Sequence, residues 1–253
     1  MAGRGLSQLY LPGSSPVHRL PAEAKLIGLV GFVVAVALTP RRAVPAFAVD
    51  AATLGTVLAM ARLPARVVLV RLTVIAPFLV FALVVPFVAT GEEVTVLGLQ
   101  LSEEGLWAAW NVSAKALLGA TAGIVVAATT RVPDLVQGLS RLRIPPMIVG
   151  IVAFMIRYSD LLVDQFGRMR RAMVARCHDP RWLWQARPIA ASAGTLFVRT
   201  YERGERVHQA MLARGFTGTM PDLGGRRAAT GDWMRALLPA AVAATVLLVV
   251  ALR

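Results

Sequence analysis

Long apolar stretches, separated by short polar connections, dominate most of this 253-residue chain. A helix needs about 20 mostly apolar residues to cross the hydrocarbon core of a bilayer. The stretches near that length are residues 22–39, 43–61, 67–89, 106–130 and 237–252. This pattern predicts an all-α, polytopic membrane protein with about five transmembrane helices, four of them before residue 131.

The long connection between the fourth and fifth stretches has a different pattern. It predicts three helices: one starting at Pro133 and stopped by Pro145-Pro146, one over residues 147–176, and one over residues 188–214. Both long helices are apolar in their first part and charged afterwards. The predicted domains are an N-terminal membrane bundle of residues 1–130, a helical insertion of residues 131–227, and a C-terminal transmembrane helix within residues 228–253.

Charge sets the predicted orientation. Residues 131–227 contain 16 Arg against 7 Asp and Glu, whereas residues 90–105 contain four Glu and no Lys or Arg. Cytoplasmic connections of membrane proteins are enriched in Lys and Arg. We therefore expect the insertion to be cytoplasmic and residues 90–105 to be outside, although Arg41 and Arg42 fall on the outer side against this rule.

Composition excludes several classes of protein. A mean hydropathy of +0.64 and 57% hydrophobic residues exclude a soluble nucleic-acid-binding protein, despite the net charge of +13. The single cysteine excludes an internal disulfide, and the first twenty residues lack the apolar core of a cleaved signal peptide, so the first span is expected to direct insertion.

The sequence also lacks motifs for chemistry. There is no G-x-x-x-x-G-K-[ST] nucleotide loop, no H-E-x-x-H and no G-x-S-x-G, and the three histidines are scattered. We expect no catalytic site, no metal site and no cofactor on this chain. Asp50 and Lys115 lie within predicted spans, where ionisable residues are candidates for a transport role; Asp50 near a span end and Lys115 extended toward the membrane surface are the alternatives.

An internal repeat joins the two long helices of the insertion. The segment Ala-Met-Val-Ala-Arg-Cys at residues 172–177 matches Ala-Met-Leu-Ala-Arg-Gly at residues 210–215, with a shift of 38 residues. An acid and an Arg four residues later precede each copy at the same shift, a spacing that predicts an ion pair on an exposed helix. The proposed docking residues are Ala175, Arg176, Cys177, Ala213, Arg214 and Gly215, supported by Asp164, Arg168, Ala172, Met173, Glu202, Arg206, Ala210 and Met211.

The repeated motif suits a helix end that docks into another protein. Small Ala side chains let a helix enter a groove, and a terminal Arg can form two parallel hydrogen bonds with a carboxylate there. Two copies indicate two similar grooves, and hence a partner with two related subunits. Coincidence is the alternative, because Arg and Ala are abundant in this chain and Arg is common at helix C-termini.

These motifs resemble the transmembrane T component of energy-coupling factor (ECF) transporters, most closely the cobalt-type CbiQ family. The resemblance rests on both Ala-Arg motifs, on residues 141–146, on Arg157-Tyr158 and on residues 20–26, and it covers residues 18–222. The family usually has Gly at the end of both motifs, so Cys177 is a departure that alters the end of the first helix.

The resemblance implies a multi-pass protein of a prokaryotic plasma membrane that does not itself catalyse a reaction. Its implied partners are two ABC-type ATPase subunits, which bind ATP and Mg²⁺ and receive the two motifs, and a small membrane-embedded S component, which binds the substrate. Residues 131–227 would then be the coupling-helix region. Cobalt or nickel is the implied substrate, with a vitamin as the alternative.

The sequence is a poor match to two other functions. A self-sufficient secondary transporter would show inverted repeats and interrupted spans near the bilayer midplane, whereas the repeat here is parallel and lies in the insertion. An intramembrane enzyme would need a polar catalytic pair within the spans, and the sequence offers none.

Overall fold

The computed structural model describes residues 9–89, 93–96, 99–178, 187–218 and 226–252. The chain forms two compact units. The membrane unit comprises Tyr10–Gly138 with Gly225–Arg253, and the insertion unit comprises Leu139–Gly224 with Met1–Leu9.

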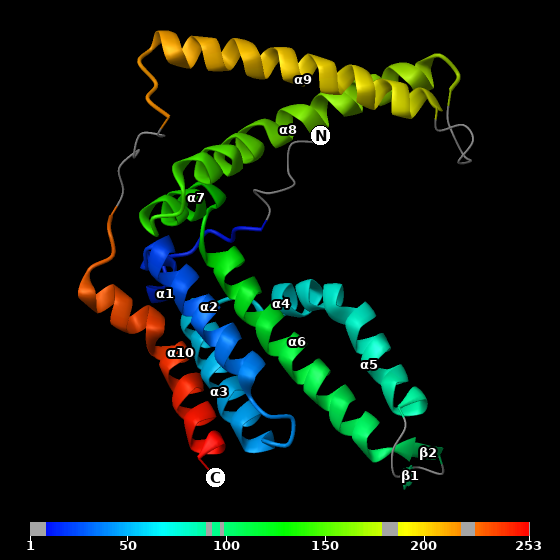
Figure 1. The fold of residues 1–253 in the computed structure, drawn as a ribbon, viewed down its shortest axis with the longest axis vertical. Helices are drawn as coiled ribbons and strands as arrows, with labels where there is room; N and C mark the ends of the chain where they lie inside the picture. Colours follow the sequence, from blue (N-terminus) through cyan, green and yellow to red (C-terminus); the bar gives the residue numbers. More distant parts are fainter. Residues whose placement is uncertain (1–8, 90–92, 97–98, 179–186, 219–225, 253) are drawn as a thin grey trace. The chain divides into compact units, whose positions relative to one another are not determined.

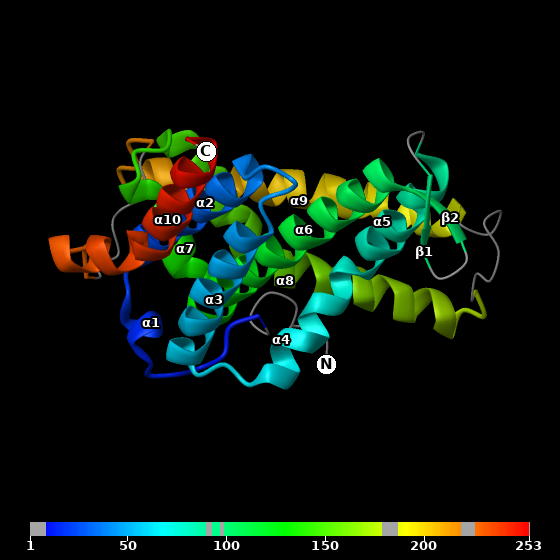
Figure 2. The same ribbon diagram turned by 90° about the horizontal axis from the view of Figure 1, so that it is seen from below.

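Helices form almost all of the membrane unit (Figure 1). Its helices α2, α3, α6 and α10 pack against one another, and α5 packs along α6 (Figure 2). The elements are α1 Pro16–Arg19, α2 Ala22–Leu38, α3 Val44–Ala61, α4 Ala65–Leu72, the 3₁₀ helix η1 Thr73–Ile75, α5 Ala76–Val88, α6 Glu103–Thr129 and α10 Thr230–Ala251, with α7 Val132–Arg141 running across the boundary to the insertion unit.

The prediction of a helical membrane protein with about five spans is confirmed. Among the residues that the structure describes, five helices are long and apolar enough to cross a bilayer, counting α4 to α5 as one. They are Val44–Ala61, Ala65–Val88, Glu103–Thr129, Pro146–Ala175 and Thr230–Ala251. Helix α2, predicted as the first span, has 17 residues, which is the lower end of the spanning range. Pro146–Ala175 lies in the insertion and was not among the predicted spans. It is long and apolar enough because its first part is apolar, as the sequence pattern predicts.

A short β-hairpin interrupts the helical pattern before α6. Strand β1 (Glu93–Val96) pairs antiparallel with β2 (Leu99–Ser102), with Glu93 opposite Ser102. The sequence predicts only an acidic connection here. The signal was the alternation of apolar and polar residues along these ten positions, which is the period of a strand.

Glycines allow two pairs of helices to approach closely. A Cβ atom added at Gly28 of α2 would lie 2.3 Å from the backbone oxygen of Ala236 in α10. A Cβ added at Gly105 of α6 would lie 2.7 Å from the Cα of Pro86 in α5. Small residues at helix contacts are typical of membrane bundles, because they let backbones pack against each other.

Lys25, at the start of the first predicted span, is buried. Its side chain is in α2, and its Nζ donates to the backbone oxygen of Thr129 and to the hydroxyl of Thr130, each at 3.0 Å. Carbonyl groups in the last turn of a helix have no partner within that helix. The Lys25 ammonium therefore stabilises the end of α6 and joins it to the start of α2.

We expect Lys25→Met to lower the free energy of unfolding by about 1–3 kcal/mol, because the Thr129 carbonyl then stays buried without its donor. Thermal unfolding of the purified chain, followed by circular dichroism, measures this. Lys115→Met is the matched control. The Lys115 Nζ also donates to a carbonyl, that of Ala37 at 2.7 Å, but this contact lies on the exposed surface of the unit. A loss as large for Lys115→Met as for Lys25→Met would contradict the explanation.

The two ionisable residues noted within the spans lie in different surroundings. The Lys115 Nζ donates to the carbonyl oxygen of Ala37 in the last turn of α2. Its positive charge therefore lies at the negative end of that helix. Asp50 lies inside α3 with 1% of its surface exposed, and neither carboxyl oxygen has a hydrogen-bond partner among the described residues. A transport role for either residue stays a prediction.

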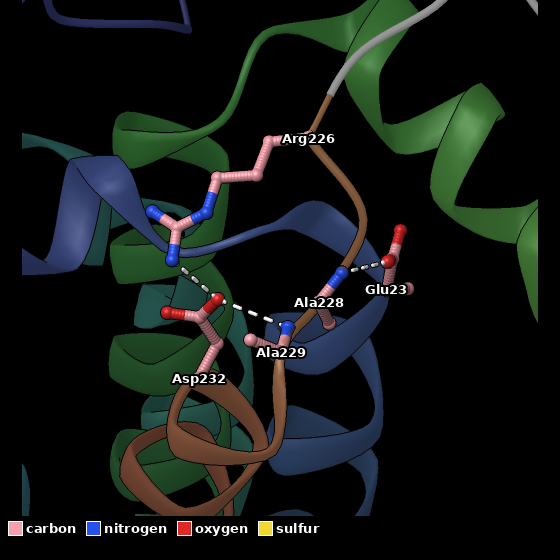
Figure 3. Close-up of polar contacts among 5 residues, drawn as sticks. All are labelled: Glu23, Arg226, Ala228, Ala229 and Asp232. Atoms are coloured by element: carbon pink, nitrogen blue, oxygen red, sulfur yellow. Dashed lines mark hydrogen bonds and ion pairs between the residues drawn. The ribbon is translucent and has the colours of Figure 1, made fainter.

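Polar contacts hold the chain where it re-enters the membrane unit before α10 (Figure 3). The carboxylate of Asp232 accepts from the amide of Ala229 at 3.2 Å and from the guanidinium of Arg226 at 2.7 Å. The carboxylate of Glu23 in α2 accepts from the amide of Ala228 at 2.7 Å. The start of α10 is therefore capped by its own acid and joined to the start of α2.

Candidate docking site

Two long helices form the insertion unit and carry the repeated motif. Helix α8 spans Pro146–Ala175 and α9 spans Arg187–Ala213. They are antiparallel, since Ser192 near the start of α9 lies 3.5 Å from the sulfur of Met173 near the end of α8. At the other end, Phe154 of α8 and Met211 of α9 line one cavity of about 330 Å³. Together with α7, these helices match the three predicted between residues 131 and 227.

The antiparallel arrangement separates the two motifs. Each motif ends one helix and lies beside the first half of the other helix. Ser192 lies beside Met173, three residues before Arg176, and each of the 22 residues from Ser192 to Arg214 adds about 1.5 Å of length. Arg176 and Arg214 are therefore separated by roughly 30 Å. One groove on a partner cannot hold both motifs, whereas two grooves on two subunits can.

Both helices end with the same hydrogen bonds. In α8, the amide of Cys177 donates to the carbonyl oxygen of Val174 at 2.9 Å. The amide of His178 donates to the carbonyl oxygen of Met173 at 3.0 Å. This pair of bonds, spanning three and five residues, is the Schellman motif.

In α9 the amide of Gly215 donates to Leu212 at 2.9 Å, and the amide of Phe216 donates to Met211 at 3.0 Å. The repeat found in the sequence is therefore also a repeat of backbone geometry. His178 and Phe216, each one residue beyond the repeated segment, complete these turns.

Cys177, which departs from the usual Gly, adopts the same backbone conformation as Gly215 in the second motif. Cys177 has a φ of 62° and Gly215 has a φ of 80°, so both are left-handed. This conformation is easily adopted by Gly and costs roughly 1–2 kcal/mol for a residue with a side chain. The first helix end thus keeps its shape at an energetic cost that the second does not bear.

The docking residues are accessible to a partner. Arg176 and Arg214 are exposed, as are the residues on either side of them. Among the supporting residues, Asp164, Met173 and Met211 are partly buried, and the others are exposed: Arg168, Ala172, Glu202, Arg206 and Ala210. The two methionines face into the unit where the helices pack. The Ala and Arg residues of each motif therefore form its outer surface.

One expected detail of the motifs is wrong. The spacing predicted ion pairs of Asp164 with Arg168 and of Glu202 with Arg206, but neither pair is among the ion pairs of the described residues. Exposed pairs of this kind contribute only about 0.3–0.5 kcal/mol, while ordering two long side chains costs entropy. These four charged groups remain available to a partner.

We expect Cys177→Gly to raise the stability of the end of α8 by roughly 1 kcal/mol, because Gly accepts the left-handed φ without strain. Hydrogen exchange at the amide of His178, which closes the turn, measures this directly. Gly215→Ala is the matched control, and it should lower the stability of the end of α9. A Cβ there would contact nothing within 4 Å, so only the backbone conformation would resist it. Slower exchange in both variants would contradict the conformational explanation.

Comparison with known proteins adds independent evidence. The family model described as cobalt transport protein, CbiQ, matches residues 13–223. Cobalt transport protein CbiQ of Rhodobacter capsulatus is 32% identical over 84% of this chain and 85% of its own length. The energy-coupling factor transporter transmembrane protein EcfT of Thermotoga maritima is 23% identical over 84% of this chain and 81% of its own. Nickel permease LarQ of Lactiplantibacillus plantarum is 32% identical over 45% of this chain and 41% of its own.

Proposed function

The chain belongs to the CbiQ family of cobalt transport proteins as an ECF-type transmembrane T component, and we propose that it transmits the motion of two partner ATPase subunits to a substrate-binding S component. It is a multi-pass protein of the plasma membrane. In this proposal the membrane unit anchors the chain, and α8 and α9 carry force between the partners.

The duplicated helix end carries this proposal. Two exposed Ala-Arg motifs with the same Schellman geometry, roughly 30 Å apart on one antiparallel pair, suit two related subunits that bind in the same way. When the two subunits approach or separate, the ends of α8 and α9 are moved together or apart. A stiff helix transmits such a displacement along its length.

The proposed grooves must offer negative charge. Each motif places a guanidinium at the C-terminal end of its helix, where it can bind a carboxylate through two hydrogen bonds. Neighbouring Ala residues permit close approach of the partner's surface. In this proposal ATP and Mg²⁺ are held by the ATPase subunits, and this chain holds neither.

We propose cobalt or nickel as the transported substrate. The support is indirect: relatives of this chain are named for cobalt transport and for nickel permeation, and others are named only as T components. Since the substrate would be recognised by the S component, a vitamin is the alternative to be tested with these two metals.

The experiment is affinity purification of the tagged chain from its native membrane in mild detergent, followed by mass spectrometry. We expect two ATPase subunits, or two copies of one, and a small hydrophobic membrane protein whose identity indicates the substrate. Reconstitution into liposomes completes the test. Uptake by this chain alone, without ATPases, would contradict the coupling role and favour a self-sufficient transporter.

A further inference from the structure

A large cavity lies within the membrane unit, where α2 and α10 begin and where α3 and α6 end. Its volume is about 810 Å³, within the range of sites that hold a sizeable ligand. Residues of α1, α2, α3, α6 and α10 line it. All of these elements belong to the same compact unit.

The inner part of the cavity is apolar. Its walls include Leu29 and Phe32 of α2, Val57 of α3, Val125 of α6 and Leu238 of α10. These residues lie one or more turns inside the ends of their helices. A ligand that reaches this depth must therefore present hydrocarbon to the protein.

The outer part of the cavity is basic. Arg19 ends α1, Arg62 caps the end of α3, and Arg235 lies in the second turn of α10. All three side chains are exposed, and none forms a hydrogen bond or ion pair with a residue that the structure describes. Three unpaired guanidinium groups therefore line one cavity at the ends of its helices.

The remaining charged groups in this part of the cavity are already engaged. Lys25 donates to Thr129 and Thr130, and Arg226 binds Asp232 (Figure 3). Asp232 is the one acid among the described residues that line the cavity. The net positive charge of Arg19, Arg62 and Arg235 is thus left without a counter-charge from the cavity lining.

We propose that this cavity binds one anionic phospholipid, with its phosphate on the three arginines and an acyl chain along the apolar walls. Arg is well suited to a phosphate, which it can bind through two hydrogen bonds. A free phosphate would leave the apolar walls uncovered, and a neutral lipid would leave the arginines without a counter-charge. The arrangement of head group at the helix ends and chain along the helices is also the orientation of a lipid in a bilayer. Basic pockets between transmembrane helices are known to take such head groups.

The test uses the purified full-length chain, freed of lipid in detergent, with native mass spectrometry as the readout. The probes are dioleoyl phosphatidylglycerol, dioleoyl phosphatidylcholine and glycerophosphoglycerol, which is the first head group without acyl chains. We expect retention of phosphatidylglycerol at one copy per chain, at least tenfold weaker binding of phosphatidylcholine, and no competition by glycerophosphoglycerol.

The double variant Arg62→Gln with Arg235→Gln should weaken binding of phosphatidylglycerol by about 30-fold, the loss expected for two arginines facing a phosphate. The matched control is Arg42→Gln with Arg66→Gln, which removes the same charge from exposed positions outside the cavity and should leave binding unchanged.

Three results would overturn the proposal. Equal binding of phosphatidylcholine would indicate an apolar cavity without head-group recognition. Competition by glycerophosphoglycerol would indicate a site for phosphate alone. An equal loss in both double variants would indicate a general effect of net charge. None of these outcomes bears on ATPase docking, which involves the insertion unit.

Discussion

Reversing the charge of Arg176 and Arg214 together, to Glu, is expected to abolish co-purification of the ATPase subunits with this chain. Each motif places its Arg at an exposed helix end with no partner in the described part of the chain. When a partner's carboxylate binds there, the guanidinium and the carboxylate both lose their hydrating water. Replacing Arg by Glu would then place a second negative charge beside that carboxylate, inside the contact.

Breaking a buried, hydrogen-bonded charge pair costs about 2–5 kcal/mol, mostly through faster dissociation. A loss of 2 kcal/mol weakens binding by about 30-fold. We expect each single reversal to weaken retention of the ATPases clearly, and the double reversal to remove it. Quantitative mass spectrometry of the complex captured on tagged membrane protein measures the ratio of ATPase to this chain.

The matched control reverses two other exposed arginines on the same helices, Arg170 in α8 and Arg199 in α9. This variant has the same net charge as the first but keeps both motifs. We expect it to retain the ATPases. Undiminished capture by the Arg176 and Arg214 double variant would refute the docking role of the motifs, and equal loss in both double variants would attribute binding to overall charge.

The second large effect concerns the membrane unit, where Gly28→Ala is expected to destabilise the packing of α2 on α10. The added Cβ would lie 2.3 Å from the backbone oxygen of Ala236. A backbone atom cannot rotate away as a flexible side chain can, so the helices must separate. Overpacking of this kind costs about 1–3 kcal/mol.

Gly119→Ala in α6 is the matched control, and its expected effect has the opposite sign. A Cβ at Gly119 would meet nothing within 4 Å. Ala in the middle of a helix is favoured over Gly by roughly 0.5–1 kcal/mol, so this variant should be slightly more stable. Thermal unfolding in the same detergent compares the two. A lower melting temperature for Gly119→Ala, or an unchanged one for Gly28→Ala, would contradict the packing argument.

Several features could be predicted from the sequence because they depend on local patterns. Apolar length identifies a span, and the helix boundaries of the insertion follow from proline, glycine and periodicity. The ends predicted at residues 176 and 214 agree with α8 and α9 to within one residue. The hairpin of β1 and β2 was missed, because the alternation of apolar and polar residues covers only four residues in each strand.

The sequence by itself determined that this is a helical membrane protein with a basic motif that occurs twice. Hydropathy and periodicity are properties of short stretches of chain, so they can be read without knowing which helices pack together. Only the tertiary structure decided where those parts lie. It paired Lys25 with Thr129, over a hundred residues away. It placed the two motifs at opposite ends of an antiparallel pair, and it brought Arg19, Arg62 and Arg235 to one cavity. These contacts join residues far apart in the chain, and no local pattern encodes which helices pack together.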